Sequence, residues 1–419
     1  MKRLFRQGKR LGMVAMAILL SGALLLGSVV PAKAAEERVV KIGLHGVLAG
    51  ALANTGVPFA YSIMDYARHF NEQGGIKGIR VEVIWEETGR SPVVQGITAH
   101  KRFKEAGVVA EINMISGACE VLARTLRRDE IPITLITAIS EAMANKPPWV
   151  FSAEASMDDA GAVIATAIKQ TWFPDKHVRL ALMIYDHLSG WAPIEGIRWA
   201  IRQGLDMEIV GVEVVPFLGA IDTTTEWMRT ASKEPDAVVQ IICGASLTTS
   251  VKDCARLGIN KKGIILFDSG YCLEETVPVA GVDAWEGWYT YGGNPYAVET
   301  ELPAVRTLLE IAAQYRGWEP QDVPGCYIKG WIQAAVTVEG MRLAIEKVGF
   351  ENLTGRAVRN GLASIKDFDV GGLMPPMSMD DTHPWWFPGV RVCQVREGRI
   401  WPISDKRFEY PGIAVEWFK

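Results

Sequence analysis

The feature that most constrains the fold of this chain is a regular alternation of strand-like runs with helical patterns. Residues 39–45 form an apolar run, 58–71 carry apolar side chains at helical spacing, and 79–87 alternate as a strand does. The order continues with a helical pattern over 91–106 and an apolar strand over 108–115. Such an alternation predicts a parallel sheet with helices on both faces.

The same alternation restarts after the Pro147-Pro148 break. Four further strand-like runs alternate with helical patterns between residues 157 and 270. A last run over 390–404 predicts a hairpin that turns at Glu397-Gly398. Because a chain of 419 residues is too long for one core, we predict an α/β fold of two doubly wound lobes.

The turn between the strand 108–115 and the next helix is a candidate anion site. Ser116, Gly117, Ala118 and Cys119 occupy the start of that helix. The first N–H groups of a helix have no partner within it, and its dipole adds partial positive charge there. Ligands of doubly wound sheets also bind beyond the carboxyl ends of the strands. The turn therefore favours a carboxylate or another anion, and the alternative is that Ser116 only caps the helix.

The N-terminus has the pattern of a secretory signal peptide. Residues 1–34 contain a basic segment, an apolar run of membrane-spanning length and a small-residue ending at Ala32-Lys33-Ala34. We expect cleavage before Ala35 and a mature protein in the periplasm. An uncleaved membrane anchor is the alternative.

Charge and cysteine content narrow the possible partners. The formal net charge is −4, and the predicted signal peptide carries only positive charges, so the mature chain is more acidic still. An acidic surface argues against nucleic acid and anionic membrane as partners.

The six cysteines are widely spaced, and none of them form a C-x-x-C motif, which argues against a disulfide scaffold or a zinc ribbon. If one pair forms, we expect Cys243 with Cys272; buried thiols are the alternative.

The chain lacks the common catalytic motifs, since it has no G-x-S-x-G, no H-E-x-x-H and no Walker A. Asp380, Asp381 and His383 have a loose spacing for a metal site, and a polar turn is the favoured interpretation. Glu86 and Glu87 adjoin in a strand and point to opposite faces, which argues against an acid–base pair. We therefore predict no enzyme, no cofactor and no metal.

Several segments resemble, in this order, the type I periplasmic binding proteins. More narrowly they resemble the substrate-binding subunits of branched-chain amino acid (LIV-type) ABC transporters. The segments are VKIGLHGVLAGALANTG, FNEQGGIKGIRVEVIWEETGRSP, ISGACEVLARTLRRDEIPITLITAIS, DFDVGGLMPPMSM and VRVCQVREGRIWPISD. The likeness spans about residues 39–407.

This resemblance implies two Rossmann-like lobes, joined by three crossovers, that close on a ligand. Lobe 1 would comprise residues 35–153 and 289–375, and lobe 2 residues 154–288 and 376–419. The crossovers would lie near 152–155, 284–290 and 375–390.

The resemblance also implies which residues hold the ligand. The turn of Ser116 would bind a carboxylate with help from Ala138 and Ser140 at the next strand end, although Ser140 could instead cap a helix. In lobe 2 an aromatic residue is expected after the first strand. Trp191 is the nearest, with packing on the lobe surface as its alternative. The remaining candidates are Asn54, Gly244, Ala245 and Asp268, and a structural role is favoured for His187.

The chain departs from this family at one position. Amino-acid-binding members carry an acid after the last strand of lobe 2 to hold the α-ammonium group, and here the aligned residue is Gly270. Asp268 and Glu274 are near but poorly placed by counting. A buried ammonium without a partner is costly, so small carboxylates without an amino group become realistic ligands, aromatic acids included. Candidate apolar walls are Trp85, Tyr271, Trp285, Trp288, Tyr289, Tyr327 and Trp331.

We therefore expect an extracytoplasmic solute-binding protein that delivers a small carboxylate, an amino acid or another acid, to ABC permease subunits. No nucleic acid is expected as a partner, and membrane contact only through the permease. The alternative is a ligand sensor that docks a receptor, and a hydrolase is a distant third.

Overall fold

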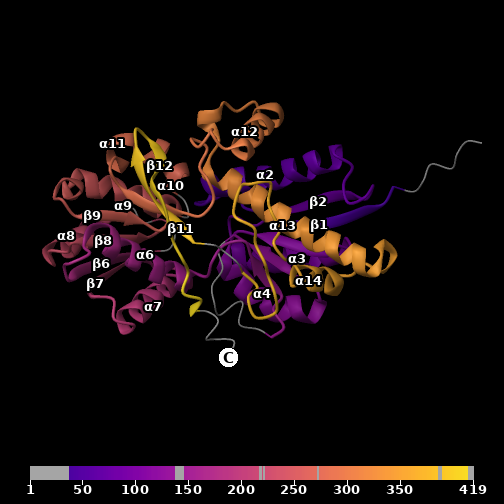
Figure 1. Ribbon diagram of the computed structural model, residues 1–419, viewed down its shortest axis with the longest axis horizontal. Helices are drawn as coiled ribbons and strands as arrows, with labels where there is room; N and C mark the ends of the chain where they lie inside the picture. The colour runs from indigo at the N-terminus through magenta and orange to yellow at the C-terminus, as the bar shows by residue number, and fades with distance from the viewer. Residues whose placement is uncertain are drawn as a thin grey trace, which may run out of the picture. The chain divides into compact units, whose positions relative to one another are not determined.

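The computed structural model, drawn in Figure 1, describes most of the chain between residues 37 and 413. The described ranges are 37–136, 146–216, 219, 222–270, 273–385 and 389–413. The predicted signal peptide, Ala138, Ser140, Tyr271 and Cys272 lie outside them. From Val40 onwards the chain forms one unit that holds two β-sheets.

Lobe 1 is the part built on a five-stranded sheet with the order β2-β1-β3-β4-β5. Its strands are β1 (Val39–Gly46), β2 (Arg80–Glu87), β3 (Ala110–Asn113), β4 (Ile133–Leu135) and β5 (Val150–Ser152). Parallel pairing joins β1 to β3, β3 to β4 and β4 to β5, as the alternation predicts.

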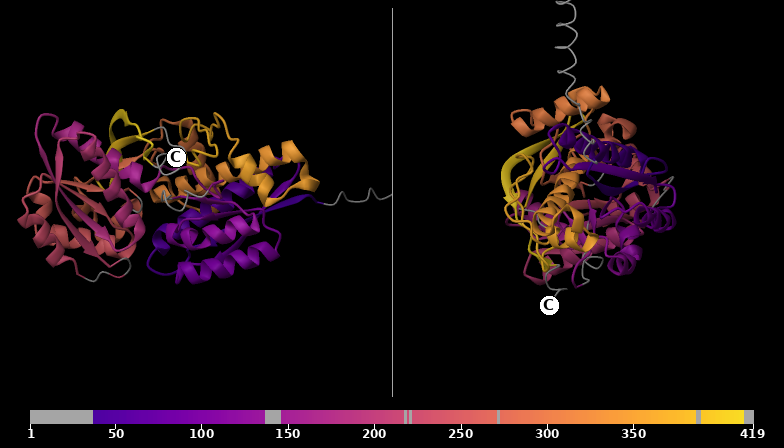
Figure 2. Two further views of the ribbon diagram at one scale, coloured as in Figure 1. Left: turned by 90° about the horizontal axis from the view of Figure 1, so that it is seen from below. Right: turned by 90° about the vertical axis from the view of Figure 1, so that its right-hand side faces the viewer.

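Helices cover both faces of the lobe 1 sheet. The helices of this lobe are α2 (Ala53–Glu72), α3 (Pro92–Glu105), α4 (Ser116–Asp129), α12 (Pro303–Arg316), α13 (Gly325–Val348) and α14 (Gly355–Leu362). Ile42 and Leu44 pack with α2 and α13 on one face, whereas Gly43 lies against Phe103 of α3 on the other. Figure 2 shows α13 in orange on the opposite side of the sheet from α3 and α4 in purple.

Lobe 2 is built on a seven-stranded sheet with the order β12-β11-β10-β9-β8-β6-β7. Its strands are β6 (Val178–Tyr185), β7 (Met207–Val215), β8 (Ala237–Ile241), β9 (Ile265–Asp268), β10 (Tyr289–Gly292), β11 (Val390–Arg396) and β12 (Arg399–Phe408). All five residues of β8 are buried, which is expected of a central strand covered on both faces. The predicted hairpin at Glu397-Gly398 is the antiparallel pair β11–β12.

The helices of lobe 2 are α6 (Met157–Trp172), α7 (Leu188–Arg202), α8 (Thr224–Ser232), α9 (Gly244–Arg256), α10 (Leu273–Ala280) and α11 (Val282–Trp285). Two glycines let α6 and α7 approach backbone to backbone. A Cβ atom on Gly161 would overlap the carbonyl of Pro193, and one on Gly196 would overlap the carbonyl of Asp158. No larger residue fits this crossing unless the two helices move apart.

The chain passes between the lobes three times. The first crossover runs from Ser152 to Met157 and the third ends at Val390. The backbone N–H of Ser152 donates to the carbonyl of Pro384 at 2.9 Å, so these two crossovers lie side by side.

The second crossover lies later than the sequence predicts, between Gly292 and Pro303. The boundary predicted at residue 289 is wrong because residues 289–292 form β10, which pairs with β9 and β11 of lobe 2. Glu299 in this crossover binds Arg391 at the start of β11, with N···O distances of 2.6 and 2.8 Å. Among the described residues, no helix has the length and apolarity that a membrane span requires.

Candidate functional site

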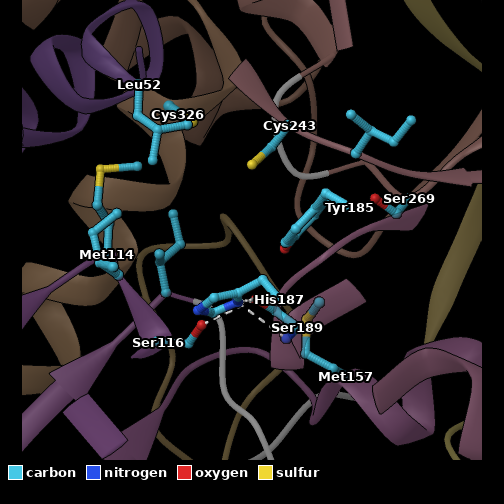
Figure 3. Close-up of a pocket in the computed structure, with 13 residues that line it drawn as sticks. Leu52, Met114, Ser116, Met157, Tyr185, His187, Ser189, Cys243, Ser269 and Cys326 are labelled. Atoms are coloured by element: carbon cyan, nitrogen blue, oxygen red, sulfur yellow. Dashed lines mark hydrogen bonds between the residues drawn. The ribbon is translucent and has the colours of Figure 1, made fainter. Parts of the chain in front are cut away.

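A cavity of about 60 Å³ lies where strand ends of lobe 1 and lobe 2 meet, and Figure 3 shows the side chains around it. The residues from lobe 1 are Leu52, Met114, Ile115, Ser116, Ile136 and Cys326. Those from lobe 2 are Met157, Tyr185, His187, Ser189, Ile242, Cys243 and Ser269. Most of them follow the carboxyl end of a strand or begin a helix, which is where doubly wound sheets bind their ligands.

The lobe 1 side of the cavity contains the start of α4. Asn113 accepts a hydrogen bond from the N–H of Ile115 at 2.8 Å, and the helix begins one residue later, at Ser116. Ile115 is therefore the N-cap, and no side chain caps this helix. The interpretation of Ser116 as a simple cap is wrong, because its hydroxyl points to lobe 2 and donates to the hydroxyl of Ser189 at 3.3 Å.

The lobe 2 side contains the start of α7. His187 is the N-cap of this helix, and its Nδ1 accepts a hydrogen bond from the N–H of Ser189 at 3.2 Å. The Ser189 hydroxyl lies 2.6 Å from the same nitrogen. Because Nδ1 is an acceptor, a neutral ring carries its proton on Nε2. Burial lowers the pKa of His187, and the Asp186 carboxylate offsets part of that effect.

The ring of His187 reaches across to lobe 1. Its Nε2 lies 2.5 Å from the position that a Cβ atom on Gly117 would occupy, so a side chain at this position would displace the ring. Figure 3 shows Ser116, Ser189 and His187 together at one end of the cavity. That end therefore combines the first N–H groups of α4 with three side chains able to donate hydrogen bonds.

The rest of the cavity wall is apolar and rich in sulfur. Met114, Met157, Cys243 and Cys326 contribute thioether and thiol groups, and the other large side chains are aliphatic apart from Tyr185. The Tyr185 hydroxyl and Ser269 supply the polar atoms on this side. A wall of this kind suits the apolar body of a ligand whose charged group is held at the other end.

The acids at and after the carboxyl end of β9 do not line the cavity. Asp268 is fully buried and accepts the N–H of Gly270 at 2.8 Å. Burial raises the pKa of Asp268 to about 7, although the Gly270 and Ser269 N–H groups and Lys329 oppose the shift. Glu275 accepts the N–H of Cys326, at the start of α13, at 2.8 Å. Within the described ranges, no carboxylate lines the cavity.

Several residues predicted for the site lie elsewhere. Ala118 and Cys119 are buried in the first turn of α4 behind Ser116. Trp191 is 41 % exposed, and its indole N–H donates to Asp186 at 3.4 Å, which places the ring on the lobe surface. Ala245 is exposed.

Two further predicted residues join the lobes instead of lining the cavity. Asn54 donates to the backbone carbonyl of Glu275 at 3.5 Å. Gly244 has a φ of +62°, and a Cβ atom there would lie 2.7 Å from the carbonyl of Ala51. This glycine therefore permits the close approach of α9 to the loop before α2. The predicted residues Ala138 and Ser140 are outside the described residues.

Those predicted aromatic walls that the structure describes do not line the cavity either. Trp285, Trp288 and Tyr327 are core residues, and Trp85 is 48 % exposed. The aromatic residue at the cavity is Tyr185, the last residue of β6. It ends the first strand of lobe 2, after which the sequence predicts an aromatic residue.

The polar turn at Asp380 has an internal set of hydrogen bonds. Asp380 accepts the N–H groups of Thr382 and His383, both at 2.7 Å. In the described part of the chain, no three His, Cys, Asp or Glu side chains gather as metal ligands. Cys119, Cys254 and Cys393 are buried free thiols, and the pairing of Cys243 with Cys272 stays a prediction because Cys272 is outside the described residues.

Comparison with solved structures shows many proteins of the same fold. The branched-chain amino acid ABC transporter protein of Thermus thermophilus with bound valine is 21% identical, with a TM-score of 0.77 over 90% of this chain and 98% of that chain. The fatty acid ABC transporter substrate-binding protein of Thermomonospora curvata is 15% identical, with a TM-score of 0.74 over 90% and 94%. An R. palustris solute-binding protein in complex with benzoate is 16% identical, with a TM-score of 0.71 over 87% and 96%.

At these identities the structural likeness shows the fold alone. No curated protein matches the chain in sequence. A family model described as periplasmic binding protein, however, matches residues 39–398. Because this match covers most of the chain and the two sheets have the expected arrangement, the protein belongs to the type I periplasmic binding proteins, a family of extracytoplasmic solute-binding proteins.

Proposed function

We propose that this protein captures a small carboxylate in the cavity between its lobes and delivers it to an ABC permease. The observation that carries the proposal is the pair Ser116–Ser189. The two hydroxyls lie 3.3 Å apart, one from each lobe, beside the N-terminus of α4, which no side chain caps. A carboxylate placed there would accept hydrogen bonds from both lobes and from the helix N–H groups.

The structural neighbours support a carboxylate as the common element. One neighbour holds valine, one is in complex with benzoate and one is a fatty acid ABC transporter protein; these compounds differ in their bodies but share a carboxylate. The predicted signal peptide, cleaved before Ala35, would export the protein to the periplasm, where a permease could receive the ligand.

Capture requires no chemistry on the ligand. A ligand that binds both lobes favours the closed state by the difference between its affinities for the closed and open states. The permease would then distinguish the liganded protein by its closed surface.

A thermal-shift screen of the mature protein with amino acids, short aliphatic acids and aromatic acids tests this proposal. A ligand present at 100 times its dissociation constant should add about 2.7 kcal/mol to the free energy of unfolding. Ser116→Ala should weaken carboxylate binding about 10-fold or more, since it removes a hydrogen bond to a charged group. Ser364→Ala is the matched control, because Ser364 is exposed and its hydroxyl donates to the nearby carbonyl of Asn360, far from the cavity lining.

Two results would contradict the proposal. The first is that no carboxylate shifts the melting temperature. The second is that Ser116→Ala and Ser364→Ala bind the same acid equally well. Co-purification with permease subunits, and loss of uptake on deletion, test delivery separately.

A further inference from the structure

The polar end of the cavity consists of hydrogen-bond donors. Its groups are the first N–H groups of α4, the hydroxyls of Ser116 and Ser189, and the ring of His187. Ser116 donates to Ser189, and the Ser189 hydroxyl contacts Nδ1 of His187. Each hydroxyl can therefore turn its proton toward an anion while the ring keeps its place.

His187 performs two separable tasks, one with each ring nitrogen. Nδ1 caps α7 by accepting the N–H of Ser189. Nε2, on the other side of the ring, lies against Gly117 in the first turn of α4 in the opposite lobe. The first task is structural and lies within lobe 2, whereas the second brings an N–H donor to the place where a ligand's anion would bind.

We propose, on the basis of the function proposed above, that His187 is the specificity-determining residue of lobe 2. Its Nε2–H donates to the carboxylate held at the start of α4, and the site takes acids that carry no α-ammonium group. Within the described ranges no carboxyl group lines the cavity to pair with an ammonium, and the nearby carboxyl groups of Asp268 and Glu275 each accept a backbone N–H group. Desolvating an unpaired ammonium costs several kcal/mol.

The neutral state of the ring fits this role. Burial keeps the pKa of His187 below its ordinary value, so the ring contributes a hydrogen bond without a fixed positive charge at neutral pH. Asp186 is the charged group that acts on it in lobe 2, Tyr185 stacks on it with ring centroids 6.0 Å apart, and the first turn of α4 faces it from lobe 1. An acidic side chain on this side would repel a carboxylate, and none lines the cavity within the described ranges.

Two pairs of probes test the ligand class. Valine and 3-methylbutanoate differ only in the α-ammonium group, and so do phenylalanine and 3-phenylpropanoate. Titration calorimetry of the mature protein should show that the unaminated member of at least one pair binds at least 100-fold more tightly than its amino acid. If an amino acid binds as tightly as its unaminated analogue, the proposed specificity is wrong, but the proposed capture of carboxylates is unaffected. If no carboxylate of any kind binds, the proposed function itself fails.

Two substitutions separate the tasks of His187. Asn can place an acceptor where Nδ1 lies and is a good N-cap, but it is too short to reach Gly117. Gln can place an N–H donor near Nε2 but is a poor cap. His187→Asn should therefore keep the melting temperature and lose about 10- to 100-fold in acid affinity. His187→Gln should lower the melting temperature and retain more of the affinity. The reverse ranking would show that His187 is only a cap.

A double-mutant cycle tests the geometry. Gly117→Ala should weaken acid binding because its Cβ atom displaces the ring. In a His187→Asn background the same change should have little further effect, since the ring is absent. Additive losses would mean that the ring does not lie on Gly117 when the acid is bound, and the proposal would then be withdrawn.

Discussion

Arg391 holds both carboxylate oxygens of Glu299 in two hydrogen bonds, and this pair joins the second crossover to the start of β11, directly after the third crossover. The side chains are 10 % and 7 % exposed. A bidentate geometry of this kind is among the stronger polar interactions in proteins.

Removing one partner of this pair should therefore be costly. Glu299→Ala would leave a buried guanidinium without its carboxylate and should lower the free energy of unfolding by about 3–5 kcal/mol. Urea denaturation measures the change. Glu310→Ala, at an exposed position on α12, is the control and should change stability by no more than about 0.5 kcal/mol. Equal effects of the two substitutions would contradict the prediction.

The pH dependence of stability should reveal the buried network around His100. Its Nδ1 lies 2.6 Å from Glu111 and its Nε2 lies 3.1 Å from Asp129, so both nitrogens donate to carboxylates. Burial alone would lower the pKa of His100, but the hydrogen bonds and charges of Glu111 and Asp129 outweigh it and raise the pKa.

A raised pKa in the folded state stabilises the protein below the unfolded pKa of about 6.5, and this contribution is lost as the pH rises through the folded value. His100→Gln should therefore cost most stability near pH 6, and the difference from the wild-type protein should narrow toward pH 9. Melting temperatures of both proteins across this range measure the difference. A gap that widens with pH would show that the ring is neutral in this network.

Replacing the Asp268 carboxyl group should stabilise the protein, whereas replacing the His100 ring should destabilise it. The pKa of Asp268 is raised to about 7 by burial, so the folded state disfavours the carboxylate, and stability falls as the pH rises from about 4 through 7. Asp268→Asn should have little effect near pH 4 and should stabilise the protein at pH 8 by about 1–4 kcal/mol. Ligand affinity should not change, because this carboxyl group does not line the cavity. A loss of affinity at pH 8 would restore Asp268 to the ligand site.

Replacing Gly196 with Ala should have two opposing effects on the free energy of unfolding. Helix propensity alone favours Ala over Gly by up to about 1 kcal/mol. A Cβ atom at this position, however, would overlap the carbonyl of Asp158 in α6. We expect Gly196→Ala to destabilise the protein by about 1–3 kcal/mol, as measured by urea denaturation, with Glu195→Ala on the exposed side of α7 as the control. A stabilising effect would mean that α6 and α7 are not in backbone contact.

The two-lobed α/β fold could be predicted because periodicity depends on local sequence alone. The hairpin at Glu397-Gly398 and the turn at Ser116 carry local signals of the same kind. The sheet that β10 joins could not be predicted in this way, since the aromatic segment WYTY suits either lobe. Its assignment depends on hydrogen bonds to β9 and β11, which are distant in sequence.

The sequence predicts that strand-end turns form the candidate site, but not which of their residues line the cavity. The turn of Ser116, predicted from the sequence, lines the cavity, and so do Leu52, His187, Ser189 and Ser269 at other strand ends. The sequence favours a structural role for His187 because a single histidine carries no motif. The sequence does carry a local signal. His187 directly precedes a helical pattern, which is the N-cap position, and Ser189 follows two residues later. The contact between His187 and Gly117 depends on how the lobes meet, which no local pattern specifies.

The three crossovers have a mechanical consequence for the whole molecule. Ser152 is hydrogen-bonded to Pro384, Arg391 is paired with Glu299, and Glu154 and Asn294 line one small pocket, so all three connections are bundled. A single tether would let one lobe twist and slide on the other, whereas parallel tethers resist torsion and shear far more than bending. Under the proposed function, ligand binding would then move the lobes mainly by bending, and a receiving permease could distinguish the filled state by one inter-lobe angle.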